Sequence, residues 1–182
     1  MAPKPKDKEE QVYEGLPAEL AAAIRRGYAQ RDRHRMEPTI DFFRQLLARY
    51  PEHAVVRYEL AGAYDTAGQE ERACELYEEA LDQGLSGEPL RRCLCQYAST
   101  LRWLGELEAS RKVLDRAHSA FPDSEGVKVF SALTHLESNK PDAAVGELLE
   151  VITAHAEATD LGRWNDGLAN LGRWLRAGRP ED

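Results

Sequence analysis

The sequence lacks any long apolar run, and it has only three cysteines among its 182 residues. A membrane-spanning helix needs roughly 18 consecutive apolar residues, so we expect no transmembrane segment and no membrane partner. The N-terminus, MAPKPKDKEE, has neither the apolar stretch nor the small-residue cleavage site of a secretory signal. Three cysteines cannot all pair in disulfides, and they suit a reducing compartment. These absences predict a soluble, cytoplasmic protein.

Basic charge is scarce as well. The chain has 24 Lys and Arg against 32 Asp and Glu, a formal net charge of −8. Binding along a phosphate backbone needs a basic face, so we expect no nucleic-acid partner. The motifs of serine hydrolases, phosphate-binding loops, zinc proteases and dinucleotide-binding folds are missing. The five histidines and three cysteines show no metal-ligand spacing. We therefore expect a non-enzymatic protein without metal or cofactor.

What the sequence does contain is a repeat of small, aromatic and turn-forming residues. One copy has Leu60-Ala61, Tyr64, Gly68, Ala73, Tyr77 and Ala80. The next has, at the same offsets, Tyr97-Ala98, Leu101, Gly105, Ser110, Leu114 and Ala117. A third has Ser131-Ala132, His135, Asn139, Ala144, Leu148 and Val151. Gly105 and Asn139 stand 34 residues apart, whereas Gly68 and Gly105 stand 37 apart. A period of this size resembles the tetratricopeptide repeat, a helix–turn–helix unit that stacks on its neighbours.

The resemblance implies an all-α fold, a right-handed superhelix of nine helices without strands. Gly68, Gly105 and Asn139 should lie in the turns inside the repeats, where a positive φ is needed at low cost. The small positions Ala61 and Ala73 should let neighbouring helices approach closely. We expect four helical hairpins over residues 16–158, with bounds 16–53, 54–90, 91–124 and 125–158.

The two ends depart from the repeat. Residues 1–15 are polar and charged, which predicts a disordered leader. Residues 159–178 should form a capping helix over the last hairpin, followed by a tail at 179–182. Its apolar stripe runs at helical spacing through Leu161, Trp164, Leu168, Leu171 and Leu175. Three glycines should make this helix the least stable element.

In the tetratricopeptide family, the first helix of each repeat (helix A) lines a concave groove that binds protein or peptide partners. The resemblance carries this groove onto Tyr28, Tyr58, Asp65, Arg92, Ser99, Arg102, Trp103 and Leu133, with Val129 and Leu136 beside the last of these. Exposed Tyr, Trp and Arg side chains dominate the binding energy of interfaces. The alternative is that Tyr58 and Trp103 only cover the core. The Lys and Asn clamp that some members use for C-terminal carboxylates has no counterpart here.

Several functions stay open after this reading. The leading prediction is a protein- or peptide-binding adaptor or scaffold. Alternatives are a small acidic secretion-type chaperone, a self-associating scaffold such as a homodimer, or a regulator of a separate enzyme or transcription factor. The arginines between Arg25 and Arg35 form a basic cluster that could dock an acidic peptide or phosphate. Their simpler role is to lie near a helix C-terminus, where the dipole favours cations.

Overall fold

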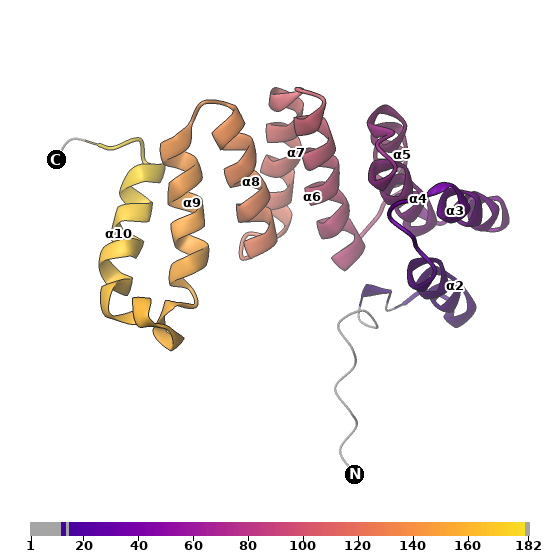
Figure 1. Cartoon of the computed structure of the whole chain (residues 1–182), viewed down its shortest axis with the longest axis horizontal. Coiled ribbons are helices and arrows are strands. Elements are labelled where there is room, and N and C mark those ends of the chain that lie inside the picture. Colours follow the sequence, from indigo (N-terminus) through magenta and orange to yellow (C-terminus); the bar gives the residue numbers. More distant parts are fainter. Residues whose placement is uncertain (1–11, 14, 181–182) are drawn as a thin grey trace, which may run out of the picture. The chain divides into compact units, whose positions relative to one another are not determined.

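The structure is a computed structural model that describes residues 12, 13 and 15–180. The described residues form nine α-helices, α2 to α10, and two short 3-10 helices, and they contain no strand (Figure 1). The expected all-α, tetratricopeptide-type fold is confirmed. The chain divides into two compact units, Met1–Thr100 and Leu101–Asp182.

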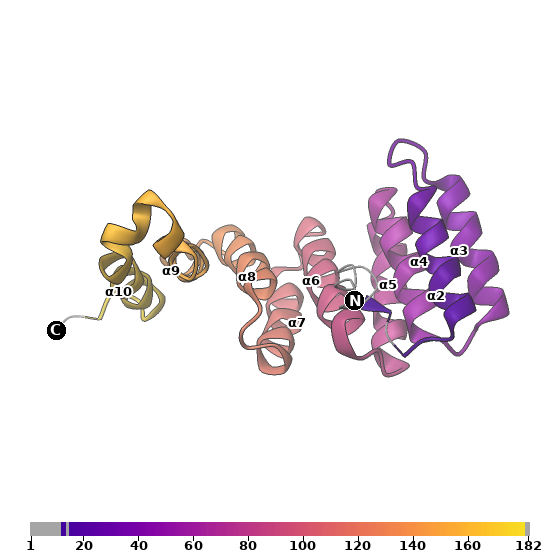
Figure 2. The same cartoon turned by 90° about the horizontal axis from the view of Figure 1, so that it is seen from below.

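The first unit is a row of packed helices. They are α2 (Ala18–Ala29), α3 (Glu37–Arg49), α4 (Ala54–Thr66), α5 (Glu70–Asp82) and most of α6 (Gly87–Trp103). Consecutive members from α2 to α5 pack side by side (Figure 2). The ring of Tyr97 on α6 lies 5.9 Å from the ring of Tyr77 on α5. These contacts make one continuous core for the unit.

Small residues set the distance between these helices, as the repeat predicts. Ala61, Ala73 and Ala80 are fully buried. Gly27 takes the place of Ala61 in the first hairpin, and a Cβ there would come within 2.7 Å of the Phe42 ring. Any side chain at this position would therefore push α2 away from α3.

The turns also follow the prediction. Gly68 and Gly105 have φ values of +72° and +80°, and Asn139 has a φ of +56°. A side chain with a Cβ is strained in this left-handed region, and Asn tolerates it better than most residues. The positive φ expected inside the three repeats is confirmed.

The predicted leader differs from the structure at Val12 and Tyr13. Both side chains are buried, at 4% and 6% exposure. The expectation of disorder is therefore wrong for these two residues, because their apolar side chains find a place on the first unit. Residues 1–11 and 14 lie outside the described residues.

The second unit continues with α7 (Leu107–Ala120), α8 (Glu125–Glu137), α9 (Pro141–Thr153) and α10 (Asn165–Arg176). Each of these helices packs on the next. Two 3-10 helices, Ala156–Ala158 and Asp160–Trp164, connect α9 to α10. The capping helix therefore begins at Asn165 instead of near residue 159. Thr159 accepts a hydrogen bond from the Leu161 amide at 3.1 Å, which caps the 3-10 turn instead of an α-helix.

The capping helix α10 packs on α9 mainly where two glycines face each other, and less through the predicted apolar stripe. Leu175 is buried, but Leu171 is 44% exposed and Trp164 is 56% exposed. A Cβ on Gly146 of α9 would lie 2.7 Å from the Gly172 carbonyl of α10. The described part of the predicted tail is also held, because Arg179 pairs with Asp142. Residues 181 and 182 lie outside the described residues.

We predict that Gly146→Ala lowers the free energy of unfolding by roughly 1–3 kcal/mol, because the new methyl group forces α9 and α10 apart. Gly167→Ala is the matched control, since a Cβ there meets nothing within 4 Å. This control should stabilise the protein by up to about 1 kcal/mol, as expected for Gly→Ala in a helix. Urea denaturation followed by circular dichroism measures both. Equal effects of the two substitutions would contradict the close approach at Gly146.

Candidate functional site

The predicted groove residues of the first unit do not form one exposed surface. Tyr58 is 2% exposed, and its ring lies 6.3 Å from that of Tyr77. The assignment of Tyr58 to an exposed groove is therefore wrong, and its ring is core. Asp65 is half-buried and accepts hydrogen bonds from Thr100 at 3.0 Å and from Tyr77 at 3.4 Å. Ser99 is half-buried on α6.

Two of the predicted residues, Tyr28 and Arg92, do come together. They line a small cavity of about 70 Å³ with Val12, Tyr13 and Arg25. Arg92 is held in place by Glu88, at 3.0 Å between Nε and Oε1. Tyr28 and Arg92 therefore share a small cavity, and Val12 and Tyr13 of the N-terminal segment contribute to its lining.

A buried carboxylate, Glu59, lies next to this cavity. It is 2% exposed, and its Oε1 accepts a 2.6 Å hydrogen bond from the Tyr13 hydroxyl. Tyr28 also donates to it. Burial raises the pKa of Glu59 to about 7, although these hydroxyls and the nearby Arg92 favour the ionised form. Glu59 was not among the predicted site residues, but a carboxylate between Tyr58 and Leu60 in an apolar helix was a signal for it.

The predicted residues of the second unit are placed differently, because two of the three are exposed. Trp103 is 74% exposed and Leu133 is 37% exposed. Arg102 differs from these two residues, because its side chain is only 10% exposed and pairs with Glu137. Its guanidinium lies 5.3 Å from the centre of the Trp103 ring. Such a stack of Arg on Trp is a favourable cation–π contact. Trp103 is thus an exposed aromatic residue that stacks on an arginine held in place by Glu137.

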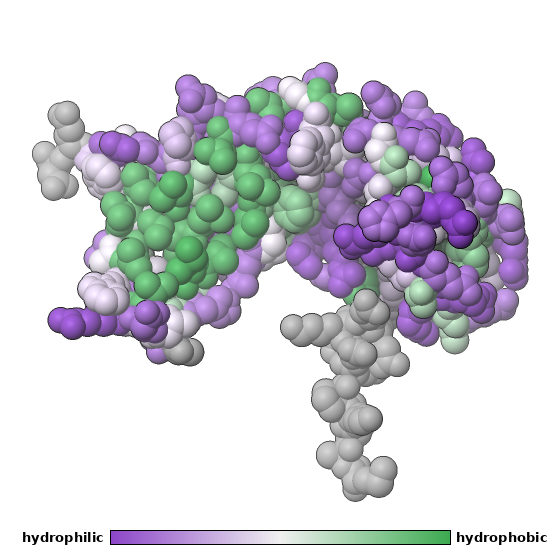
Figure 3. Space-filling view, in the orientation of Figure 1, coloured by the Kyte–Doolittle hydropathy of each residue, from purple (hydrophilic) through white to green (hydrophobic). Residues whose placement is uncertain are grey.

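Exposed apolar side chains are concentrated in this unit. Among the described residues, the exposed large apolar side chains are Trp103, Leu104, Leu133, Leu136, Val145, Leu148, Ile152, Leu161, Trp164, Leu171 and Trp174. Figure 3 shows apolar side chains gathered over α8, α9 and α10. We call the exposed members on these three helices and their connection, from Leu133 to Trp174, the apolar face. Soluble proteins rarely expose a large contiguous patch of this kind unless something binds it.

A polar hollow of about 530 Å³ lies elsewhere in the second unit, lined by residues of α7 to α10. Its buried carboxylate, Glu147, accepts a hydrogen bond from Ser131 at 3.3 Å, and its Oε1 lies 3.8 Å from Nε2 of both His118 and His135. Burial raises the pKa of Glu147 to about 6 and lowers the pKa values of the two histidines. No group of His, Cys, Asp or Glu among residues 12, 13 and 15–180 is arranged to hold a metal ion.

Comparison with known proteins agrees with this architecture. The family described as tetratrico peptide repeat matches residues 54–172, well over half of the chain. The chain belongs to the tetratricopeptide repeat family. A solved structure reported as "Functional Characterization of Pseudomonas Aeruginosa pilF" aligns with a TM-score of 0.63, covering 97% of this chain and 80% of that one. At 20% identity, this likeness concerns the fold alone. The comparison with curated proteins gave no match.

Tetratricopeptide proteins generally mediate contacts between proteins as adaptors or scaffolds. No helix in the described part of this family member has the length and apolar character needed to cross a bilayer. Its described residues have a small cavity beside Glu59 in the first unit, and a polar hollow and the apolar face in the second.

Glu59 makes the stability of this tetratricopeptide protein depend on pH. With a folded pKa near 7 and an unfolded value of 4.5, the folded state binds the extra proton between these values. Stability should therefore fall as pH rises from about 4.5 to about 7, and then level off. We predict that Glu59→Gln removes this loss, on the order of 1–3 kcal/mol at pH 8, with little effect at pH 4.5.

Thermal melts between pH 4.5 and pH 8 measure this effect. Glu71→Gln, at an exposed position on the same unit, is the matched control. A difference between Glu59→Gln and wild type that stays constant across the pH range would contradict the raised pKa.

Proposed function

We propose that this chain is a non-enzymatic adaptor or scaffold that docks a protein partner on the apolar face of its second unit. The observation that carries the proposal is the confinement of exposed large apolar side chains, within residues 12, 13 and 15–180, to the second unit. Burying such side chains gives roughly 25 cal/mol per Å² of apolar surface removed from water. A partner that covers the apolar face therefore has a strong source of affinity.

The spacing of the exposed residues indicates what kind of partner fits. Val145, Leu148 and Ile152 form a stripe along α9, and α8 and α10 lie on either side of this helix. Stripes on neighbouring helices form ridges and grooves into which another helix can pack. An amphipathic helix of a partner, with apolar residues at three- and four-residue steps, is the complementary occupant.

Aromatic residues support the same use of this unit. Trp103 and Trp164 are both more than half exposed, and each has an arginine guanidinium within 6 Å of its ring. Trp and Arg are the residue types most enriched at binding hot spots. Leu133 and Leu136 also lie on α8, a helix A of the repeat, which is the face that the family uses for its partners.

A photo-crosslinking amino acid at Leu136 should capture a discrete partner in cells, whereas the same amino acid at Glu71 of the first unit should not. Leu148→Asp should then lower the affinity for the purified partner at least tenfold, because it places a charge inside the apolar contact. Isothermal titration calorimetry measures this, with Glu71→Lys as the control. Unchanged affinity of Leu148→Asp would exclude the apolar face.

The identity of the captured species also separates the alternatives. A second copy of this chain would favour a self-associating scaffold, and sedimentation equilibrium would show its stoichiometry. A single unfolded client would favour a chaperone. Reversible binding of a helical segment, seen as a gain in helicity on mixing, is the outcome expected for an adaptor.

Trp103 lies outside the apolar face, at the end of α6, and we propose that the partner contacts it as well. We predict that Trp103→Ala weakens the partner complex by roughly 2 kcal/mol, the size expected of a hot spot, while the circular dichroism spectrum stays helical. Trp103 is 74% exposed, so its removal leaves no cavity in the core. Unchanged affinity in calorimetry would remove Trp103 from the site.

A further inference from the structure

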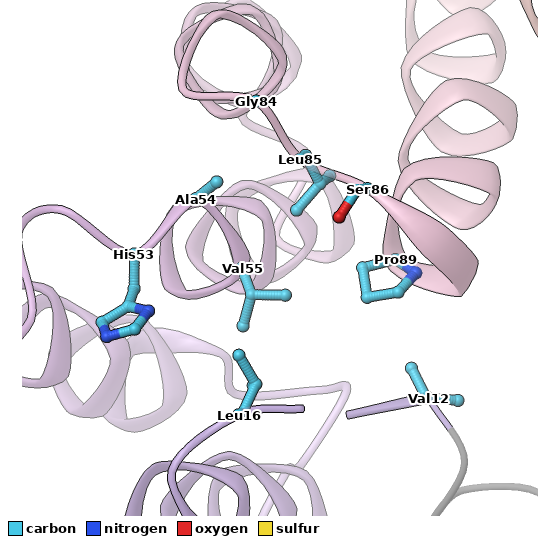
Figure 4. Close-up of a pocket in the computed structure, with 9 residues that line it drawn as sticks. All are labelled: Val12, Leu16, His53, Ala54, Val55, Gly84, Leu85, Ser86 and Pro89. Carbon is cyan, nitrogen blue, oxygen red and sulfur yellow. The ribbon is translucent and has the colours of Figure 1, made fainter. Parts of the chain in front are cut away.

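The N-terminal segment Val12–Tyr13 lies against the first unit like a bound peptide. Both side chains are buried, and the Tyr13 hydroxyl donates a 2.6 Å hydrogen bond to Glu59, which lies 46 residues away in the sequence. Val12 and Leu16 line one wall of a cavity of about 170 Å³ whose other wall includes Val55 and Pro89. Figure 4 shows Leu16 pointing toward Val55, with Val12 below Pro89.

The place that Tyr13 occupies is built to receive a phenol. Glu59 supplies a buried acceptor, and Tyr28 donates to the same carboxylate. Tyr28 and Arg92 form walls of the small cavity that touches Val12 and Tyr13. A buried carboxylate is costly unless hydroxyls satisfy it, so this site strongly favours a side chain that brings an O–H.

The segment is attached to the repeats by a simple hinge. Gly15 has a φ of +93° and open space around the position of a Cβ. The Leu16 amide donates to the Tyr13 carbonyl at 3.2 Å, a bond inside the segment itself. The contact with Glu59, in contrast, uses a side chain alone. Gly15 therefore gives the backbone after Tyr13 a point about which it can turn.

We propose that the site around Glu59 binds a tyrosine-containing segment of a partner protein, and that residues 12 and 13 fill this site in the free protein. The ligand is a segment with an aliphatic residue directly before an unmodified tyrosine, matching Val12 and Tyr13. A phosphotyrosine is excluded, because its phosphate would meet the Glu59 carboxylate. This site lies in the first unit and is independent of the apolar face of the second.

The chain's own residues Val12 and Tyr13 compete with the partner for this site, and this competition lowers the apparent affinity for the partner. A ligand tethered by a few residues has an effective concentration in the millimolar range. An external segment must displace it, so the wild-type protein should bind weakly until its own segment is removed.

The test uses the full chain and a fluorescein-labelled peptide with the sequence of residues 8–17. In fluorescence anisotropy, the double variant Val12→Ser/Tyr13→Ser should bind this peptide at least tenfold more tightly than wild type does. At pH 8, where Glu59 is ionised, replacing tyrosine by phenylalanine in the peptide should weaken binding roughly tenfold through loss of the hydrogen bond to a charged acceptor. The phosphotyrosine peptide should not bind. Equal affinities of wild type and double variant, or equal affinities of the Tyr and Phe peptides, would overturn the proposal.

A second measurement covers the case in which the double variant does not fold. Full-length protein with 3-fluorotyrosine at position 13 gives a fluorine resonance of the buried ring. Millimolar unlabelled peptide should move this resonance to the position of a solvent-exposed tyrosine, and an unchanged resonance would overturn the proposal. Leu148→Asp in the second unit should leave the peptide affinity as it is, so failure of this site and failure of the apolar face are separable.

Discussion

The close approach of helices across small residues is the constraint on which both units depend. In the first unit, Ala61, Ala73 and Ala80 have no exposed surface. In the second, Gly146 and Gly172 bring α9 and α10 so close that a methyl group on either would meet backbone atoms. Because the spacing is fixed by these contacts, larger residues must either fill the space left between helices or lie outside it.

The two units use this scaffold in opposite ways. The first encloses polar groups: Glu59 lies under tyrosine hydroxyls, and Asp65 accepts bonds from Thr100 and Tyr77. The second has its apolar side chains outside, over α8, α9 and α10. A buried carboxylate selects ligands that can donate a hydrogen bond to it. An apolar face supplies affinity with less discrimination, because the hydrophobic effect is not directional. The two proposed binding surfaces differ in character, which suits the proposed role of bringing partners together.

The sequence predicted the fold well because the repeat residues act locally. A glycine or asparagine at Gly68, Gly105 and Asn139 marks a turn through its own backbone conformation. The site was predicted less well, because burial depends on residues far away in the sequence. Tyr58 occupies a groove position in the repeat, yet its ring is covered, and periodicity contains no information about which segment covers it. Leu161 and Trp164 continue an apolar helical stripe, but the Thr159 cap forms a 3-10 turn there instead.

The two buried glutamates show where this chain departs from the rules of a simple core. Glu59 and Glu147 both lie on the buried faces of their helices, and burial raises the pKa of each. Replacing a buried charge by an apolar residue of similar volume is often neutral or stabilising, so packing alone does not explain a carboxylate at either position. Each one lies beside a concavity, with tyrosines around Glu59 and histidines around Glu147. Departures from local consistency are expected at functional sites. Glu59 already holds a tyrosine of its own chain, and this contact is the basis for the tyrosine-containing ligand that we propose.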